Sequence, residues 1–209
     1  MKFKPIIVVA GEPNSIFSEI FFKSLKKLKI KKIIILITSL KLLKLQMNKL
    51  KYKSSIRIID PKKLQNYKLD NKSINLININ FKQTKAFNKI STKSNKFLKS
   101  SFDLAFRLMK EKKINKIING PISKKHFLQK KFLGMTEYFA QKTNSKGEEV
   151  MLIFNKDLAV CPLTTHLPLK KIFKKITKDK IIKHVNKVHN FYRYYFKKKI
   201  KIAITGLNP

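Results

Sequence analysis

The chain has 209 residues, 43% of them hydrophobic and 11% aromatic, which excludes a disordered polymer and allows a sizeable core. Its 49 basic and 11 acidic residues leave a formal net charge of +38. Only three basic residues are arginine, and the lysines are spread along almost the whole chain. Because recognition of phosphates and bases favours the arginine fork, we interpret the charge as a solvated lysine surface produced by an AT-rich coding bias. We expect no specific nucleic-acid partner, with a basic nucleic-acid-binding domain as the alternative.

The sequence offers no candidate for a membrane span or a signal peptide. The longest uncharged apolar run, Ile33–Leu40, is far below the roughly 20 residues that cross a bilayer. The N-terminal apolar run is interrupted at Gly11 and lacks a cleavage site, so it is predicted to be a strand. The single cysteine, Cys161, excludes an internal disulfide framework and is interpreted as a small core residue at a strand end. We therefore expect a cytoplasmic protein.

Short β-branched runs alternate with helical stretches along the chain, which predicts an α/β fold with a largely parallel sheet. The predicted strands are Ile6–Ala10, Ile33–Ile37, Ile56–Ile59, Ile74–Ile79, Ile114–Ile118, Val150–Phe154, Leu158–Leu163 and Ile200–Thr205. Apolar residues at three- and four-residue spacing predict helices at Ile16–Leu28, Ser94–Lys112 and Thr177–Phe196. A further helix is expected to begin near Pro168.

Three of the five glycines, Gly11, Gly120 and Gly206, each follow a predicted strand, and a proline comes soon after each. Ligands of open α/β sheets bind at the carboxyl ends of strands, where the backbone bends sharply or approaches a ligand. This coincidence predicts the edge of a site, with ordinary strand-to-helix turns as the alternative. The chain contains neither G-x-G-x-x-G nor G-x-x-x-x-G-K-[ST], so a bound dinucleotide requires another architecture.

His166 is the candidate metal ligand among the four histidines. It follows a predicted strand and is flanked by the hydroxyls of Thr164 and Thr165. A neutral imidazole at that edge suits a divalent metal, although a lone histidine is more often structural or exposed. The histidines in lysine-rich helical stretches are predicted to be solvated: His126, His184 and His189.

Five segments, in order, resemble the motifs of one enzyme family. GEPNSIFSEI at Gly11–Ile20 is similar to GDPAGIGPEI, and GPISK at Gly120–Lys124 matches GPI[SN]K. GMTEYFA at Gly134–Ala140 resembles GHTEFLA, and TTHLPL at Thr164–Leu169 matches TTHIPL. IAITGLNP at Ile202–Pro209 resembles a segment that leads into a histidine-containing HAGE motif. By these motifs the chain resembles the 4-hydroxythreonine-4-phosphate dehydrogenase family.

The resemblance implies a fold like that of isocitrate and isopropylmalate dehydrogenases, with two α/β domains around a cleft completed by a homodimer partner. We expect a first domain at 1–122 and the start of a second at 123–209. The implied activity is NAD(P)-dependent oxidation of 4-phosphohydroxy-L-threonine to 2-amino-3-oxo-4-phosphobutanoate. Decarboxylation to 3-amino-2-oxopropyl phosphate follows, in the biosynthesis of pyridoxine 5'-phosphate.

Individual roles carry over only where this sequence matches the motifs. The resemblance assigns His166 to a divalent metal (Zn, Mg or Co) that polarises the substrate, and Thr136 to substrate binding. Met135 stands where the family has a substrate-binding histidine. Glu12 and Lys124 are possible cleft residues from the first two motifs, while catalytic residues are not assigned.

Two departures from the family motifs affect the expected activity. A thioether at Met135 cannot supply the hydrogen bond of a histidine, so either the substrate is bound differently or another phosphorylated hydroxy acid is the substrate. Ser15, Phe17 and Ser18 replace Gly, Gly and Pro in the first motif, which changes that loop. The chain ends at Pro209, one residue before the expected second metal histidine, so we expect an inactive, less stable, C-terminally incomplete fragment.

Overall fold

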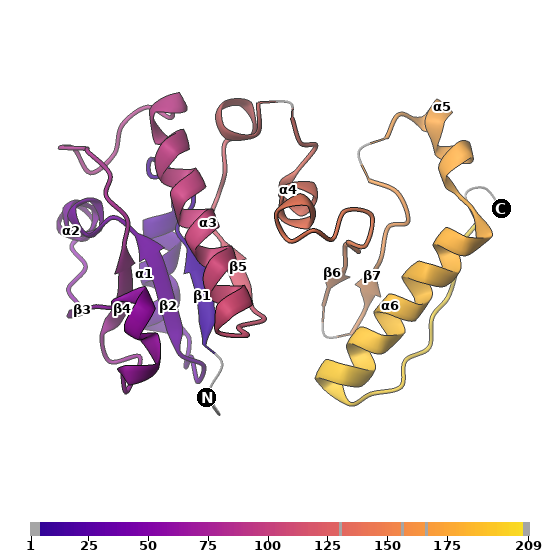
Figure 1. Cartoon of the computed structure of the whole chain (residues 1–209), viewed down its shortest axis with the longest axis horizontal. Coiled ribbons are helices and arrows are strands. Elements are labelled where there is room, and N and C mark those ends of the chain that lie inside the picture. The colour runs from indigo at the N-terminus through magenta and orange to yellow at the C-terminus, as the bar shows by residue number, and fades with distance from the viewer. Residues whose placement is uncertain (1–4, 130, 156, 166, 207–209) are drawn as a thin grey trace. The chain divides into compact units, whose positions relative to one another are not determined.

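The computed structural model describes residues 5–129, 131–155, 157–165 and 167–206, and it divides into two compact units. Unit 1 is Met1–Phe132 and unit 2 is Leu133–Pro209. Figure 1 shows the ribbon of the whole chain. The division falls later in the chain than the expected domain boundary between residues 122 and 123.

Unit 1 is built on a five-stranded parallel sheet with the strand order β3-β4-β2-β1-β5. The five predictions of a strand in this part of the chain are confirmed, with ends that differ by a few residues. The strands are β1 (Ile6–Val9), β2 (Ile34–Thr38), β3 (Ile56–Ile58), β4 (Ile74–Asn78) and β5 (Ile117–Asn119). The predicted parallel arrangement of buried apolar strands therefore holds for unit 1.

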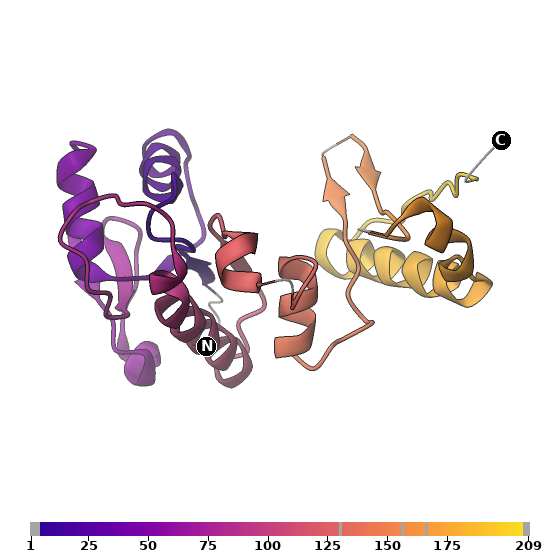
Figure 2. The ribbon, with the colours of Figure 1, turned by 90° about the horizontal axis from the view of Figure 1, so that it is seen from above.

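Helices cover both faces of this sheet. In Figure 2, α1 (Phe17–Lys27) and α2 (Leu40–Lys49) lie on one side of the strands and α3 (Asn95–Glu111) on the other. Both α1 and α3 were predicted, whereas α2 was not. Shorter helical segments complete unit 1: η1 (Pro61–Asn66), η2 (Thr92–Ser94) and η3 (Lys124–Leu128).

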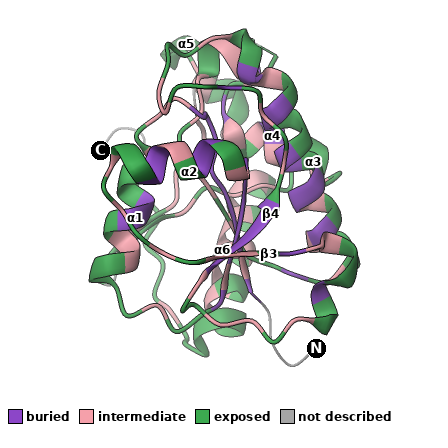
Figure 3. Cartoon of the chain, turned by 90° about the vertical axis from the view of Figure 1, so that its left-hand side faces the viewer, coloured by how far each residue is buried: buried purple, intermediate pink, exposed green. Residues whose placement is uncertain are grey.

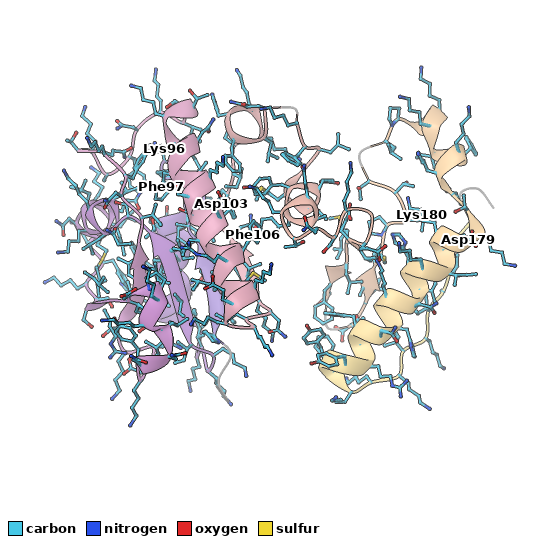
Figure 4. The ribbon with its side chains drawn as sticks, in the orientation of Figure 1. Lys96, Phe97, Asp103, Phe106, Asp179 and Lys180 are labelled. Atoms are coloured by element: carbon cyan, nitrogen blue, oxygen red, sulfur yellow. The ribbon has the colours of Figure 1, made fainter. Side chains whose placement is uncertain are left out.

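Strand register explains why the core is continuous across the sheet. Val8 pairs with Leu36, and Leu36 pairs with Leu76, so the three side chains form a row on one face. They are buried against a cluster that includes Phe22 of α1 and Leu43 of α2. Figure 3 shows the strands of unit 1 as mostly buried and the outer faces of the helices as exposed. On α3, Phe97 is buried while Lys96 and Asp103 are exposed (Figure 4).

Unit 2 contains two short antiparallel strands and several helices. The strands are β6 (Ile153–Phe154) and β7 (Ala159–Val160), so the two predicted strands exist but are shorter and not parallel. The helices are α4 (Met135–Lys142), α5 (Leu169–Ile172), η4 (Phe173–Lys175) and α6 (Lys178–Phe196). The prediction of α6 is confirmed, as is a helix that begins after Pro168.

The predicted strand at Ile200–Thr205 is wrong, because residues 200–206 pair with no strand in the part of the chain that the structure describes, and 201–206 are exposed. Alternating apolar residues form a strand only where a neighbouring strand accepts their backbone hydrogen bonds. Little of unit 2 is buried: its described core hydrophobics are Tyr138 and Ala140. Phe154 instead packs on Tyr192 and Phe196 of α6, at ring-centroid distances of 6.2 and 5.6 Å.

Glu148 joins the turn after α4 to α6 through ion pairs with Lys183 and Lys187. Hydrogen bonds from Lys183 and then Lys187 lower the pKa of Glu148 to about 2, from an ordinary value of 4.5. A carboxylate with a depressed pKa stabilises the fold above its unfolded-state pKa, and this contribution is lost as pH falls. We therefore expect unit 2 to lose stability between about pH 4.5 and about pH 2.

Amide hydrogen exchange in α6, followed over this pH range, measures that loss. Glu148→Gln is expected to flatten the pH dependence, because the amide cannot carry the charge that Lys183 and Lys187 neutralise. The control is Glu111→Gln, which removes an exposed carboxylate from α3 and should leave the pH profile of α6 unchanged. An unaltered profile in Glu148→Gln would show that these ion pairs do not stabilise unit 2.

Candidate functional site

Gly11 and Gly120 bring the carboxyl ends of β1 and β5 into direct backbone contact. Gly11 has a φ of +76°, and a Cβ on it would lie 2.5 Å from the carbonyl oxygen of Pro121. A Cβ on Gly120 would collide with the carbonyl oxygen of Ala10 and lie 2.6 Å from Cδ2 of Phe17. Both glycines are thus required by the close approach of protein backbone, in addition to any approach of a ligand.

This contact lies at the point in the sheet where the chain reverses its direction of winding. From β1 the chain runs to β2, β3 and β4 on one side, and α3 then carries it back to β5 on the other side. In open α/β sheets, ligands bind outside the carboxyl ends of the strands at such a switch point. The predicted position of the site edge at Gly11 and Gly120 is therefore consistent with the topology.

Glu12 is buried at this switch point, with 2% of its surface exposed. Its backbone N–H donates to the carbonyl oxygen of Pro121 at 2.8 Å. Its Oε2 accepts a hydrogen bond of 2.8 Å from the hydroxyl of Ser94, at the start of α3. Oε1 is also buried but has no hydrogen-bond partner. Glu12 thus ties the loop after β1 to both β5 and α3.

Lys124, the other possible cleft residue, opens η3 three residues after Pro121, and its side chain is exposed. The backbone N–H of Glu12 binds Pro121, three residues before Lys124, so the two segments lie next to each other. Ser123 caps η3, and its hydroxyl lies 2.8 Å from Nδ1 of His126. His126 is half-buried, so it is less exposed than the predicted solvated side chain. The Ser123 hydroxyl thus contacts both the ring and the backbone N–H of His126.

The other two helical histidines are half-buried too. Nδ1 of His184 lies 2.9 Å from the carbonyl oxygen of Lys180, one turn earlier on α6. His189 lies on the same helix and is likewise half-buried. Both side chains are thus only partly exposed, less than the predicted solvated histidines would be.

A network of buried amides holds the loop after β1, and the sequence reading did not identify it. Nε2 of Gln46, on α2, donates to the carbonyl oxygens of Pro13 at 2.8 Å and Ala86 at 3.1 Å. Oε1 of Gln46 accepts from the hydroxyl of Ser18 on α1. In the sequence, the only sign of this network is Gln46 itself, a polar residue on the apolar face of a helix.

A second amide extends this network. Nε2 of Gln83 donates to Oδ1 of Asn14 at 2.9 Å, and the same oxygen accepts from the backbone N–H of Asn88 at 2.9 Å. Gln83 is itself buried. Together the two glutamines join residues 13–14 to residues 83–88, so the loop beside Glu12 has a fixed position within unit 1.

The substrate-binding candidates lie in unit 2, in the first turn of α4. Gly134 is the buried N-cap residue, Met135 is half-buried and Thr136 is exposed. The hydroxyl of Thr136 is therefore free to meet a ligand from solvent. Next to it, Glu137 is half-buried and its Oε2 has no hydrogen-bond partner. Glu137 was not among the predicted site residues.

The predicted metal ligand, His166, lies outside the described residues. The flanking Thr164 and Thr165 are half-buried. Among the described residues there is no group of three His, Cys, Asp or Glu side chains that could hold a metal ion. A catalytic zinc site takes three protein ligands, so the described side chains do not form one by themselves.

Cys161 follows β7 directly, as predicted, but it is half-buried rather than a core residue. Its burial raises the pKa of the thiol above the ordinary value. A raised pKa leaves less of the reactive thiolate at neutral pH, so Cys161 is not a candidate nucleophile.

A hollow of about 290 Å³ lies at the opposite edge of the sheet, around the first residues of β2 and β4. The amide of Asn71 in its lining donates to the carbonyl oxygens of Ile30 and Lys32. The amide of Asn75 donates to Ile34 and Asp70. These amide donors already bind backbone carbonyl oxygens in the wall of the hollow, so they are not available to a ligand. The hollow is therefore a weaker candidate for a ligand-binding site than the sheet edge at Glu12.

No described helix is long and apolar enough to cross a membrane. Nitrogen-tipped side chains project from many sides of each unit (Figure 4). The positive charge is therefore not gathered on one face, as a dedicated nucleic-acid groove would require.

Comparison with known proteins identifies relatives along nearly the whole chain. A 4-hydroxythreonine-4-phosphate dehydrogenase from Sulfurihydrogenibium is 32% identical over 217 aligned positions, covering 98% of this chain and 63% of that protein. The enzyme of the same name from Neisseria meningitidis serogroup A is 42% identical over 79 residues, which cover 37% of this chain. The chain thus spans less than two thirds of the length of these relatives.

Solved structures with the same fold lead to the same group of proteins. A structure from Salmonella typhimurium assigned to this enzyme has a TM-score of 0.84 at 21% identity, covering 99% of this chain and 64% of its own. One from Klebsiella pneumoniae has a TM-score of 0.77 over 91% of this chain and 59% of its own. The sequence pattern of the family described as "Pyridoxal phosphate biosynthetic protein PdxA" matches residues 29–209. The chain is a member of the pyridoxal phosphate biosynthetic protein PdxA family.

Proposed function

We propose that this chain is part of an NAD(P)-dependent 4-hydroxythreonine-4-phosphate dehydrogenase that oxidises 4-phosphohydroxy-L-threonine. The observation that carries the proposal is the alignment of 98% of the chain with a relative of that name. The ketone product would be 2-amino-3-oxo-4-phosphobutanoate, which loses carbon dioxide to give 3-amino-2-oxopropyl phosphate. Pyridoxine 5'-phosphate biosynthesis is the pathway that this reaction would serve.

In this proposal Thr136 contributes a hydroxyl to substrate binding, and its exposure at the start of α4 supports the role. His166 would be one ligand of a divalent metal. The described side chains do not complete a metal site, and Gly11 and Gly120 are filled by backbone rather than forming an open cradle for a dinucleotide. We therefore assign substrate contact to Thr136 and a scaffolding role to Gly11 and Gly120. We expect turnover to require further residues of the longer relatives.

Exposed apolar side chains on unit 2 support this expectation. Leu158, Leu169 and Phe173 are 71%, 69% and 68% exposed. Apolar surface of this kind is normally covered by another part of the protein or by a partner subunit. We propose that the relatives' additional residues and a second copy of the chain cover it in the complete enzyme, which would then be a homodimer.

The test is an assay with 4-phosphohydroxy-L-threonine, NAD⁺ or NADP⁺, and Zn²⁺, Mg²⁺ or Co²⁺, read as the absorbance of reduced nicotinamide. It compares the 209-residue chain with a chimera in which the Sulfurihydrogenibium relative's unaligned C-terminal part follows Pro209. We expect turnover from the chimera and none from the chain alone. Turnover by the 209-residue chain would contradict the need for further residues, and an inactive but folded chimera would contradict the activity.

Two substitutions in the chimera test the assigned roles. His166→Ala is expected to reduce turnover by about 100-fold, the effect of removing a metal-site residue. Thr136→Val keeps the side-chain shape and should raise KM about tenfold, because one hydrogen bond to the substrate is lost. Thr84→Val, at an exposed position of unit 1, is the control and should change neither constant. Unchanged turnover in His166→Ala would remove that residue from the metal site.

Met135 favours a second candidate, oxidation of another phosphorylated hydroxy acid by the same machinery. A thioether cannot donate the hydrogen bond that the family's histidine supplies. If the substrate has changed, Met135→His in the chimera should raise kcat/KM for 4-phosphohydroxy-L-threonine. A decrease would show instead that Met135 belongs to a different way of binding this substrate.

A further inference from the structure

Glu12 carries a buried carboxylate oxygen for which the described residues supply no partner. Oε2 is bound by the hydroxyl of Ser94 at 2.8 Å, whereas Oε1 has no hydrogen-bond donor. No ion pair among the described residues involves Glu12, although the chain has 49 lysines and arginines. Buried charges in proteins are normally paired or bound to metal ions, so Oε1 indicates a missing cationic partner.

A second unpartnered oxygen belongs to the same turn. Asn95 directly follows Ser94, and its Nδ2 donates to the carbonyl oxygen of His126 at 2.9 Å. This bond fixes the orientation of the amide, so that Oδ1 is the buried atom without a donor. Buried acceptor oxygens without a donor thus occur on Glu12 and on Asn95, the residue after the Ser94 that binds Glu12.

The start of α3 stabilises the carboxylate only in part. A helix N-terminus carries a partial positive charge, and Ser94 adds one hydrogen bond to Oε2. Neither of these contributions gives Oε1 a hydrogen-bond donor. A ligand of Oε1 has to be a cation or a small hydrogen-bond donor, since a carboxylate oxygen only accepts.

We propose that a monovalent cation, K⁺, Na⁺ or NH₄⁺, binds at Oε1 of Glu12, with Oδ1 of Asn95 as a second ligand. One carboxylate balances one positive charge, and the amide oxygen of Asn95 is neutral; oxygen ligands suit hard cations. A divalent ion would leave an uncompensated charge in the interior, and no other His, Cys, Asp or Glu of the described residues completes a site there. The site links the loop after β1 to α3 and does not depend on the proposed dehydrogenase activity.

The first experiment compares the melting temperature of the 209-residue chain in KCl, NaCl, NH₄Cl and N-methylglucamine chloride at equal chloride concentration. Equal chloride keeps anion screening of the lysine surface constant, so that cation identity is the only variable. We expect at least one small cation to raise the melting temperature by about 4 °C, as for a site about tenfold above its dissociation constant. Glu12→Gln, which keeps the shape but removes the charge, should abolish this difference.

The matched control is Glu19→Gln, which removes an exposed carboxylate from α1 and should preserve the cation dependence. Should Glu12→Gln fail to fold, anomalous scattering from wild-type crystals soaked in RbCl decides, with a peak expected at Oε1 of Glu12. Equal melting temperatures in all four salts together with no rubidium peak at Glu12 would overturn the proposal, and a water molecule would then be the partner of Oε1.

Discussion

Gly120→Ala is expected to destabilise unit 1 by about 3 kcal/mol or more, and the variant is expected to express largely as unfolded or aggregated protein. The added Cβ would collide with the carbonyl oxygen of Ala10 and lie 2.7 Å from its carbonyl carbon. Backbone cannot move away as a flexible side chain can, because the N–H of Gly120 is bound to Val9 at 2.8 Å. Relief would require β1 and β5 to separate, which would expose the core beneath them. Urea unfolding followed by circular dichroism measures the loss.

Gly147→Ala is the control for this substitution. Gly147 has a φ of +80°, but nothing lies within 4 Å of the position that its Cβ would take. Only backbone strain is then expected, about 1 kcal/mol. Gly120, unlike Gly147, has no positive φ, so equal destabilisation by the two substitutions would show that the contact between β1 and β5 can relax to admit a Cβ.

Replacing Gln46 with Leu should cost about 3 kcal/mol, because a single buried amide satisfies three groups in three segments. The change leaves the carbonyl oxygens of Pro13 and Ala86 without a donor and the hydroxyl of Ser18 without its acceptor. Each unsatisfied buried group contributes a penalty of about 1–3 kcal/mol, partly relieved where water can enter. Urea unfolding measures the total, and hydrogen exchange at residues 13–18 and 84–88 should accelerate.

The matched control is Gln65→Leu, at an exposed position in η1, where a change within about 0.5 kcal/mol is expected. If Gln46→Leu has the same urea midpoint as the wild type, burial of the leucine side chain raises the free energy of unfolding by as much as the lost hydrogen bonds lower it. In that case the bonds of the loop after β1 to β5 and α3, together with those of Asn14 to Gln83 and Asn88, are enough to hold it.

The sheet of unit 1 was readable from the sequence because its strands are short runs rich in isoleucine. Ile34–Thr38 is apolar up to its last residue, and Ile74–Asn78 is apolar except for Asn75 and Asn78. The helix at Leu40–Lys49 was not recognised, because only Ser39 separates it from β2. The apolar residues of the strand continue into the helix, which hides the change from strand to helix spacing. The direction of the strands in unit 2 was predicted wrongly for a related reason. A strand of two residues is too short for its sequence to distinguish parallel from antiparallel pairing.

By itself the sequence determined the α/β class, the positions of the core strands and the membership of the family, since these depend on local periodicity and on short motifs. It also placed Glu12, Gly11 and Gly120 at strand ends. Only the tertiary structure showed that Glu12 is bound by Ser94, 82 residues away, and that Gln83 is bound to Asn14, 69 residues away. Hydrogen-bond partners so distant along the chain are chosen by the order of the strands and the packing of the helices, which no local pattern encodes.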